Sequence, residues 1–306
     1  MKKVAIYGYY RTEKSFTYLL LLLDLLQKYE VEIIFQKNFY EQLKKHKNTF
    51  QGKTEYLLQS FPEFKTFTGY EDLPTDTSVF FTYGGDGTIL RAITFIREKN
   101  IPVFGINAGR LGFLATVQKE QIEKAVHWYF KGEYHISERN LISIDTSPEI
   151  DEIKEINFAL NELVINRKNT TAMINIETHI DNEYLTTYWA DGLIVATPTG
   201  STAYSLSCNG PIIEPQSSNF VITPISPHNL TVRPFVISNK HTIQLKVESR
   251  EEEFLISLDS RNYSIPKHTQ ITASKASFNI KLIQFKSNTF IKTLQQKLLW
   301  GKDERN

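Results

Sequence analysis

The chain has 306 residues, of which 41% are hydrophobic, and this is enough for two domains with their own cores. Its 35 basic residues nearly balance its 34 acidic residues, so composition gives no support for a nucleic-acid or anionic-membrane partner. Cys208 is the only cysteine, which excludes an internal disulfide and a metal–thiolate cluster.

In the first 138 residues, predicted strands alternate with predicted helices. This alternation predicts parallel pairing with right-handed crossovers, and therefore an α/β, Rossmann-like domain. Ligands of such sheets bind at the carboxyl ends of the strands. Strands are expected at residues 4–8, 31–35, 78–82 and 101–107, helices at residues 15–29, 39–47, 89–96 and 119–129, and an irregular polar stretch at residues 48–77.

The apolar run at residues 18–26 is the one membrane-like feature of the sequence. It contains Asp24 and is too short to span a bilayer. The polar and charged residues before it do not fit a signal peptide. We therefore expect a buried helix packed on a sheet, in a soluble cytoplasmic protein.

From about Ser137 the pattern changes to short alternating or β-branched runs, which predict an all-β, sandwich-like second domain. The tail reads as a strand at residues 278–285 and a helix at residues 288–300, and we expect it to pack back on the first domain. The predicted domains are residues 1–138 with 277–306, and residues 139–276. Strands of the second domain are expected at residues 141–145, 173–180, 183–188, 242–247, 254–258 and 269–272.

The sequence Tyr-Gly-Gly-Asp-Gly-Thr at residues 83–88 joins a predicted buried strand to a predicted helix. Its glycines let the backbone turn sharply and approach a ligand, and the helix start offers free N–H groups to a phosphate. Asp86 repels an anion unless it holds a metal or takes a proton, so the motif points to phosphoryl transfer. It is neither the Walker lysine loop nor the G-x-G-x-x-G fingerprint. The alternative is a plain glycine turn with a solvated Asp86.

Two other loops carry polar residues with two possible explanations each. Arg110 could meet a phosphate and Phe113 could close over a base, or both could belong to an ordinary loop with Phe113 in the core. Asn161 and Glu162 interrupt two apolar runs, and burying either one unpaired costs on the order of several kcal/mol. A carboxylate that accepts two ribose hydroxyls, beside an amide that reads a base edge, would explain them. A polar β-turn would explain them equally well.

Residues 190–207 read as an apolar strand, a Pro/Gly turn and a helix start rich in hydroxyl groups. Thr199, Ser201 and Thr202 could cap that helix and also donate to a phosphate or an adenine. Capping alone would explain any one of them. Three hydroxyls around one glycine, with Tyr204 close behind, exceed what a cap needs.

In their order along the chain, these motifs closely resemble those of an NAD kinase of the ATP-dependent, bacterial type. The resemblance covers about residues 78–262, whereas diacylglycerol and sphingosine kinases share only the Gly-Gly-Asp-Gly-Thr motif. It implies phosphorylation of the adenosine-ribose 2′-hydroxyl of NAD by ATP, which gives NADP and ADP. The motifs lie at residues 84–88, 105–107, 111–114, 161–162, 191–192, 197–204, 224–228 and 233–234.

The resemblance also implies roles for individual residues. Asp86 would deprotonate the 2′-hydroxyl, and the glycine turn would cradle the donor phosphates with Mg²⁺, for which no protein ligand is assigned. Thr202, Ala203 and Ser207 would line the adenine side, and Asp191 would face the nicotinamide amide. The full expected binding set is Gly85, Gly87, Thr88, Arg110, Phe113, Asn161, Glu162, Asp191, Thr199, Thr202, Ala203, Tyr204 and Ser207.

Three positions depart from the family pattern or have an uncertain role. Trp189 stands where many family members carry arginine, so a basic contact must come from elsewhere or be absent. The sequence Cys-Asn-Gly at residues 208–210 stands where small residues are commoner, which affects helix packing more than chemistry. His228 could meet a phosphate, but a packed loop histidine is the preferred interpretation.

Residues 173–189 carry more large apolar side chains than one buried face needs. A symmetric contact would bury the surplus and cover exposed strand edges, which predicts a homodimer or homotetramer through the β-rich domain. The family resemblance implies the same, with a neighbouring subunit near the nicotinamide end of the pocket. Trp189 would then lie near both the interface and the substrate.

Two other functions fit the sequence less well. A lipid kinase of the same superfamily leaves Asn161, Glu162 and the hydroxyl-rich turn without a role on a diacylglycerol. A non-catalytic NADP-sensing module gains nothing from Asp86 beside a phosphate. The expected partners are therefore NAD and ATP, with no nucleic acid and no membrane.

Overall fold

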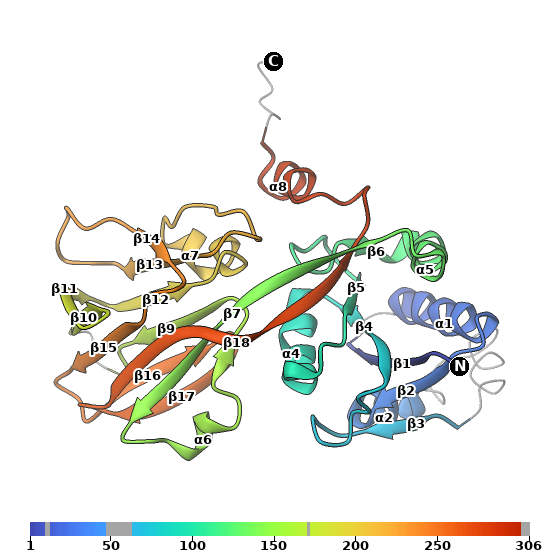
Figure 1. Cartoon of the computed structure of the whole chain (residues 1–306), viewed down its shortest axis with the longest axis horizontal. Helices are drawn as coiled ribbons and strands as arrows, with labels where there is room; N and C mark the ends of the chain where they lie inside the picture. Colours follow the sequence, from blue (N-terminus) through green and yellow to red (C-terminus); the bar gives the residue numbers. More distant parts are fainter. Residues whose placement is uncertain (10–12, 47–62, 170–171, 301–306) are drawn as a thin grey trace. The chain divides into compact units, whose positions relative to one another are not determined.

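The computed structural model describes residues 1–9, 13–46, 63–169 and 172–300 (Figure 1). The chain divides into two compact units, residues 1–138 with 280–306, and residues 139–279. Of the irregular stretch expected at residues 48–77, residues 48–62 lie outside the described residues.

The first unit contains a parallel sheet in the order β3-β2-β1-β4-β5, with the end of the long strand β18 (Gln270–Gln284) beside β5. This confirms the α/β prediction. The other strands of the sheet are β1 (Lys3–Gly8), β2 (Glu32–Gln36), β3 (Lys65–Phe67), β4 (Thr77–Gly84), β5 (Val103–Asn107) and the short β6 (Val117–Gln118) beside β5.

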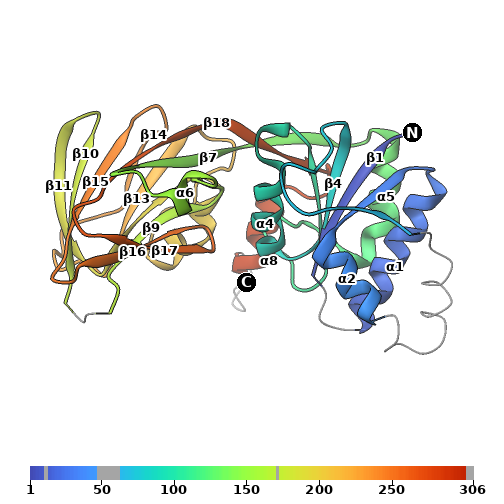
Figure 2. The same ribbon diagram turned by 90° about the horizontal axis from the view of Figure 1, so that it is seen from below.

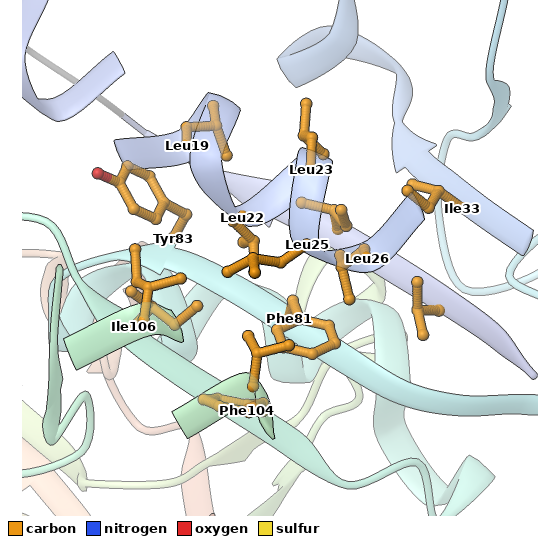
Figure 3. Packing of buried hydrophobic residues seen from close by; sticks show 14 of the residues in the cluster. Leu19, Leu22, Leu23, Leu25, Leu26, Ile33, Phe81, Tyr83, Phe104 and Ile106 are labelled. Carbon is orange, nitrogen blue, oxygen red and sulfur yellow. The ribbon is translucent and has the colours of Figure 1, made fainter. Parts of the chain in front are cut away.

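Helices cover both faces of this sheet. On one face α1 and α5 lie side by side (Figure 2), and leucines of α1 point toward Phe81 and Phe104 of the sheet (Figure 3). On the other face lies α4, and its Phe95 packs against Phe80 of β4 with 6.5 Å between the two ring centroids. The helical segments of this unit are α1 (Glu13–Lys28), α2 (Lys37–His46), α4 (Asp86–Ile96), η1 (Arg97–Lys99), η2 (Lys119–Gln121), α5 (Ile122–Lys131) and α8 (Phe290–Leu298).

The apolar run at residues 18–26 lies within α1, and its leucines belong to the largest cluster of the first unit. The prediction of a buried helix on a sheet is confirmed, because the side chains alternate between this core and the helix surface at helical spacing. Among the described residues, no helix combines the length and apolar character needed to cross a membrane.

The C-terminal tail returns to the first unit, as predicted. Leu282 of β18 pairs with Val103 of β5. Phe285 then packs against Phe104 and Trp128, at 5.4 and 5.6 Å between ring centroids. The strand expected at residues 269–272 and the one expected at residues 278–285 are thus one continuous strand of 15 residues.

The second unit consists of antiparallel strands in two layers, with a common apolar core between them, and this confirms the sandwich-like prediction. One layer runs β11-β10-β15-β18, with β7 beside β18 and β8 beside β7; the other runs β14-β13-β12-β9-β16-β17. The remaining strands are β7 (His135–Ser147), β8 (Phe158–Ala159), β9 (Glu162–Asn166), β10 (Ile174–Ile180), β11 (Glu183–Ala190), β12 (Gly192–Ala196), β13 (Asn219–Ile225), β14 (Phe235–Ser238), β15 (Ile243–Glu248), β16 (Glu253–Leu258) and β17 (Arg261–Pro266), and the helical turns are α6 (Asp151–Lys154), η3 (Gly200–Thr202) and α7 (Tyr204–Ser207).

Candidate functional site

The glycine motif forms a tight junction between β4 and α4. Gly84 ends the strand, Gly85 is the N-cap, and the helix begins at Asp86, three residues earlier than expected. A Cβ on Gly84 would lie 2.1 Å from Thr88 Oγ1, so this glycine is required by packing. A Cβ on Gly85 or Gly87 would meet no atom within 4 Å. Those two positions therefore leave the backbone at the helix start accessible, as a phosphate site needs.

Asp86 does not extend into solvent, as the plain-turn alternative required. Its Oδ2 accepts the backbone N–H of Phe113 at 2.8 Å, and its Oδ1 accepts those of Leu114 and Ala115 at 3.1 and 2.9 Å. A Cβ on Gly112 would lie 1.9 Å from Oδ1, so only glycine fits beside this carboxylate. A carboxylate has about four acceptor positions, and three are occupied here. Asp86 thus fixes the loop after β5 and retains one acceptor position on Oδ2.

Asn107, at the end of β5, holds the same loop from the other side. Its side-chain Oδ1 accepts the N–H of Gly109 at 2.7 Å, and its Nδ2 donates to the carbonyl oxygen of Arg110 at 2.5 Å. Arg110 itself is exposed. Sequence reasoning missed this role of Asn107, although asparagine side chains commonly accept the backbone N–H two residues later, here that of Gly109.

Phe113 is half-buried, so it is neither fully in the core nor fully free to close over a base. Its ring lies 6.4 Å from that of Phe290, and Lys297 Nζ lies 5.6 Å from its centroid. Asn288 donates to the carbonyl oxygen of Thr116 at 3.0 Å. Helix α8 and the residues before it therefore contact the loop that Asp86 anchors.

In the second unit, Glu162 begins β9 and is 6% exposed. Its carboxylate accepts the backbone N–H of Tyr204, and Oε2 has no partner among the described residues. Burial, followed by the charge of Asp259, raises the pKa of Glu162 to about 8. Burial thus favours the neutral form of this carboxyl group, which can accept a hydrogen bond from a ligand and also donate one.

The turn after β12 packs directly against Asn161. The N–H of Thr197 donates to the carbonyl oxygen of Asn161 at 2.8 Å. A Cβ on Gly200 would lie 2.0 Å from that same carbonyl oxygen. This contact requires glycine, because any side chain would separate the two turns.

The expected capping by Thr199, Ser201 and Thr202 is wrong. Neither η3 nor α7 has a side-chain cap, and it is Thr197 Oγ1 that accepts the N–H of Gly200, at 3.2 Å. Ser201 Oγ instead donates to the carbonyl oxygen of Pro198 at 2.7 Å. Thr199 is 6% exposed, and its hydroxyl has no partner among the described residues. A buried polar group left without a partner is unusual and marks a place where a ligand could bind.

Each unit thus gathers part of the expected set. The first unit holds Gly85, Asp86, Gly87, Thr88, Arg110 and Phe113 around the β4–α4 junction and the loop after β5. The second unit places Asn161 and Glu162 against the segment that carries Thr199, Thr202, Ala203 and Tyr204, with Ser207 exposed at the end of α7.

Asp191 stands apart from its expected companions in the second unit. It precedes β12, whereas the hydroxyl-rich turn follows that strand, which at a rise of ~3.3 Å per residue separates them by roughly 20 Å. Its carboxylate pairs with Arg167 Nε at 3.1 Å. Nearby, Trp189 is 51% exposed and lies 4.2 Å from the ring of His228. His228 is exposed as well, so it is a stacked loop residue and is not packed in a core.

Sequence reasoning also missed Asp259, in the turn between β16 and β17. Its carboxylate accepts the backbone N–H groups of Leu160 and Asn161 at 3.0 and 2.7 Å. An isolated aspartate in a polar turn gives no signal for such a contact, because its partners are nearly a hundred positions away.

The described residues contain no group of three or more His, Cys, Asp or Glu side chains that could hold a metal ion. Mg²⁺ commonly binds through substrate phosphates and only one or two carboxylates. A Mg²⁺ ion that arrives with ATP therefore does not require such a group, and no protein ligand is assigned to it.

Two family models match the chain: the ATP-NAD kinase N-terminal domain over residues 10–134 and the ATP-NAD kinase C-terminal domain over residues 160–285. The NAD kinase of Flavobacterium psychrophilum is 44% identical over 99% of this chain and 100% of its own length. The chain belongs to the NAD kinase family. The NAD kinase of Cytophaga hutchinsonii is 42% identical, again over 99% of both chains.

Solved structures of the NAD kinase family agree with the fold. Yeast NADH kinase in complex with NADH superposes with a TM-score of 0.82 at 25% identity, over 99% of this chain and 89% of the yeast chain. An NAD kinase from Archaeoglobus fulgidus in complex with ATP gives a TM-score of 0.71 at 24% identity, over 95% of this chain and 98% of that chain, and it shows the fold alone.

Proposed function

We propose that this chain transfers the γ-phosphoryl group of ATP to the adenosine-ribose 2′-hydroxyl of NAD, giving ADP and NADP. The observation that carries the proposal is the full-length identity of 44% to an NAD kinase, together with Asp86 at the accessible start of α4. Incubation of the purified protein with Mg²⁺, ATP and NAD, with NADP read by an NADP-specific dehydrogenase, tests it. Diacylglycerol as acceptor tests the lipid-kinase alternative.

The proposed base is Asp86. The 2′-oxygen attacks the γ-phosphorus, its proton passes to the Asp86 carboxylate, and the bond from the γ-phosphorus to ADP breaks. Three backbone N–H groups orient the carboxylate, and one acceptor position of Oδ2 remains for that proton. Mg²⁺ bound with ATP would neutralise developing charge on the phosphate oxygens.

The proposed binding roles follow the two gathered sets. Gly85, Gly87 and Thr88 would place the start of α4 at the phosphates, with the exposed Arg110 as a nearby cation. Glu162 and Thr199 each carry a buried oxygen that has no partner in the described part of the chain, and a ribose or adenine group would satisfy it. Asn161, Phe113, Thr202, Ala203, Tyr204 and Ser207 complete the proposed dinucleotide contacts.

We also propose that residues 139–276 bind the substrate and form the contact of a homodimer or homotetramer, in a cytoplasmic protein. The exposed Tyr184 and Trp189 of β11 support the oligomer, because β11 is the edge strand of its sheet. The distance of Asp191 from the hydroxyl-rich turn of its own chain also supports it, since a neighbouring subunit would then lie near the nicotinamide end of the pocket.

A further inference from the structure

Asp259 occupies a strained position in the two-residue turn between β16 and β17. Its φ is 54°, in the left-handed region that favours glycine at this place in a hairpin. The residue surface is partly exposed at the turn, while its carboxylate points inward and burial raises its pKa. An aspartate at a position where glycine fits better indicates that its side chain makes specific contacts.

That side chain forms a clamp on the segment that carries Glu162. The carboxylate accepts the N–H groups of Leu160 and Asn161 at 3.0 and 2.7 Å, and that of Glu162 at 3.4 Å. In return, the N–H of Asp259 donates to the carbonyl oxygen of Glu162 at 3.1 Å. Four bonds to three consecutive residues fix both the position and the direction of the chain at the start of β9.

Arg261 extends the clamp toward earlier residues of the same segment. Its guanidinium donates to the carbonyl oxygen of Ile156 at 2.8 Å and to that of Phe158. It also donates from Nε to the carbonyl oxygen of Leu258 at 3.2 Å. The β16–β17 hairpin therefore holds residues 156–162 through their N–H groups with Asp259 and through their carbonyl groups with Arg261.

The opposite side of the same segment faces the hydroxyl-rich turn. The carbonyl oxygen of Asn161 accepts the N–H of Thr197, and Glu162 accepts the N–H of Tyr204. Because a peptide group presents its N–H and its carbonyl in opposite directions, the segment transmits the position of Asp259 to the turn. Any shift at Asp259 would displace Asn161 and Glu162 relative to Thr197 and Tyr204.

We propose that Asp259 is a positioning residue for dinucleotide binding, acting through Asn161 and Glu162. The proposal rests on the proposed function, which assigns those two residues to NAD. Asp259 itself is not proposed to contact the substrate. It orients the chain at the start of β9 and places a negative charge beside the Glu162 carboxyl.

The electrostatics of the site agree with the geometry. Burial is the largest cause of the raised pKa of Glu162, and the charge of Asp259 is the second. The hydrogen bond from the N–H of Tyr204 lowers the pKa of Glu162, and the positive charge of Arg261 lowers the pKa of Asp259. Since ribose hydroxyls donate to the ionised carboxylate, the KM for NAD should fall as the pH rises through about 8.

Asp259→Asn tests the proposal, because both carboxylate oxygens accept N–H groups and an amide can accept on only one side. We expect the KM for NAD to rise about tenfold or more, with a smaller change in kcat and in the KM for ATP. The pH at which the KM for NAD changes should move to lower values. Ser260→Ala, at the exposed neighbouring position of the same turn, is the control and should leave all three quantities unchanged.

Asp259→Glu separates the effect of carboxylate position from the effect of its charge. This variant also provides the test if Asp259→Asn does not fold. It keeps the negative charge but displaces the carboxylate by one methylene, so the KM for NAD should rise while the pH dependence stays near that of the wild type. A folded Asp259 variant with the wild-type KM for NAD and the wild-type pH profile would overturn the proposal.

Hydrogen exchange gives a readout that needs no turnover. In Asp259→Asn, the amides of residues 160–162 should exchange at least tenfold faster than in the wild type and in Ser260→Ala, and unchanged exchange would overturn the positioning role. If the wild type forms no NADP, the proposed function fails, whereas this exchange result still decides whether Asp259 positions the segment.

Discussion

The Asp86 carboxylate accepts the backbone N–H of Phe113 at 2.8 Å, which joins the start of α4 to the loop after β5. The residue proposed as the base is thus also the anchor of a loop proposed to contact the substrate. Replacement of Asp86 by asparagine affects both roles. The amide cannot take the substrate proton as a carboxylate does, and it can accept hydrogen bonds from the loop on only one side.

Asp86→Asn should lower kcat by about 10²–10⁴-fold, the usual cost of losing a general base. Nucleotide binding, measured by calorimetry, should weaken by less than about tenfold, since most of the site remains. Asp76→Asn is the control, because Asp76 forms an exposed ion pair with Lys3. Near-wild-type turnover in Asp86→Asn would mean that Asp86 serves only as a loop anchor.

Gly112→Ala should impair catalysis although Gly112 is not itself proposed to contact the substrate. The added Cβ would lie 1.9 Å from Asp86 Oδ1, so the carboxylate or the loop must move. Overpacking of this kind costs roughly 1–3 kcal/mol, and we expect a lower melting temperature and a kcat reduced about tenfold or more. Gly109→Ala, whose nearest neighbouring atom is 4.0 Å away, is the matched control. Identical behaviour of the two variants would refute the close packing at Gly112.

Glu162→Gln should raise the KM for NAD more than the KM for ATP. Above about pH 8, where the Glu162 carboxylate is ionised, loss of a hydrogen bond to this charged group is worth roughly 1.5–3 kcal/mol, or about 10–150-fold in affinity. Glu183→Gln, at an exposed position of β11, provides a matched control. Steady-state kinetics with each substrate varied in turn measures the effect. An unchanged KM for NAD with reduced stability would favour the polar-turn interpretation of Glu162.

Glu162 should also make stability depend on pH in a defined direction. Its pKa is raised from an ordinary value of 4.5 to about 8 in the folded protein. The stabilisation of the folded protein by the neutral side chain is therefore fully present below about pH 4.5, and it is lost as the pH rises to about 8. One pKa unit corresponds to about 1.4 kcal/mol. When the pH is raised from 5 to 8, the free energy of unfolding of Glu162→Gln should therefore increase by roughly 1–4 kcal/mol relative to that of the wild type.

Urea unfolding of both proteins at pH 5 and pH 8 measures this difference. A difference in unfolding free energy that is the same at both pH values would show that Glu162 is not neutral in the folded protein.

The protein should form a homodimer or homotetramer in solution. Tyr184 and Trp189 expose 58% and 51% of their surface on the edge strand β11, and a symmetric contact would bury them. Light scattering after size exclusion at low micromolar concentration should give two or four times the chain mass of 35.4 kDa. A mass near that of one chain, with full activity, would rule out a functional oligomer.

Patterns within one segment were sufficient to predict most of the first unit. The apolar run of β4 and the helical spacing that follows it are local properties, and both elements are present. The start of α4 was placed three residues too late, because glycine has a low helix propensity. In the structure Gly87 is nevertheless helical, with Asp86 as the acidic residue of the first turn.

Strands of the second unit were missed where local pattern and tertiary role disagree. Strand β13 contains Pro224, which normally argues against a central strand, yet β13 lies between β12 and β14. Strand β17 has a largely polar sequence and pairs only with β16 at the end of its sheet. Tertiary pairing outweighed intrinsic propensity in both cases.

The contacts that position the proposed site could not be predicted from local sequence. Asp86 bonds to residues 27–29 positions later, and Asp259 bonds to residues 97–99 positions earlier. Nothing in a short window indicates which distant backbone N–H groups these two aspartates accept. Residue type and motif order predicted which residues gather in each unit, whereas the hydrogen bonds that fix them depend on the fold.

The most direct test is the initial rate of NADP formation from Mg²⁺, ATP and NAD, measured in parallel for the wild type and for Asp86→Asn. We predict NADP formation by the wild type that depends on both ATP and NAD, and a rate lower by about 10²–10⁴-fold in the variant. Absence of NADP with the folded wild-type protein, under conditions in which ATP and NAD both bind, would contradict the proposed function.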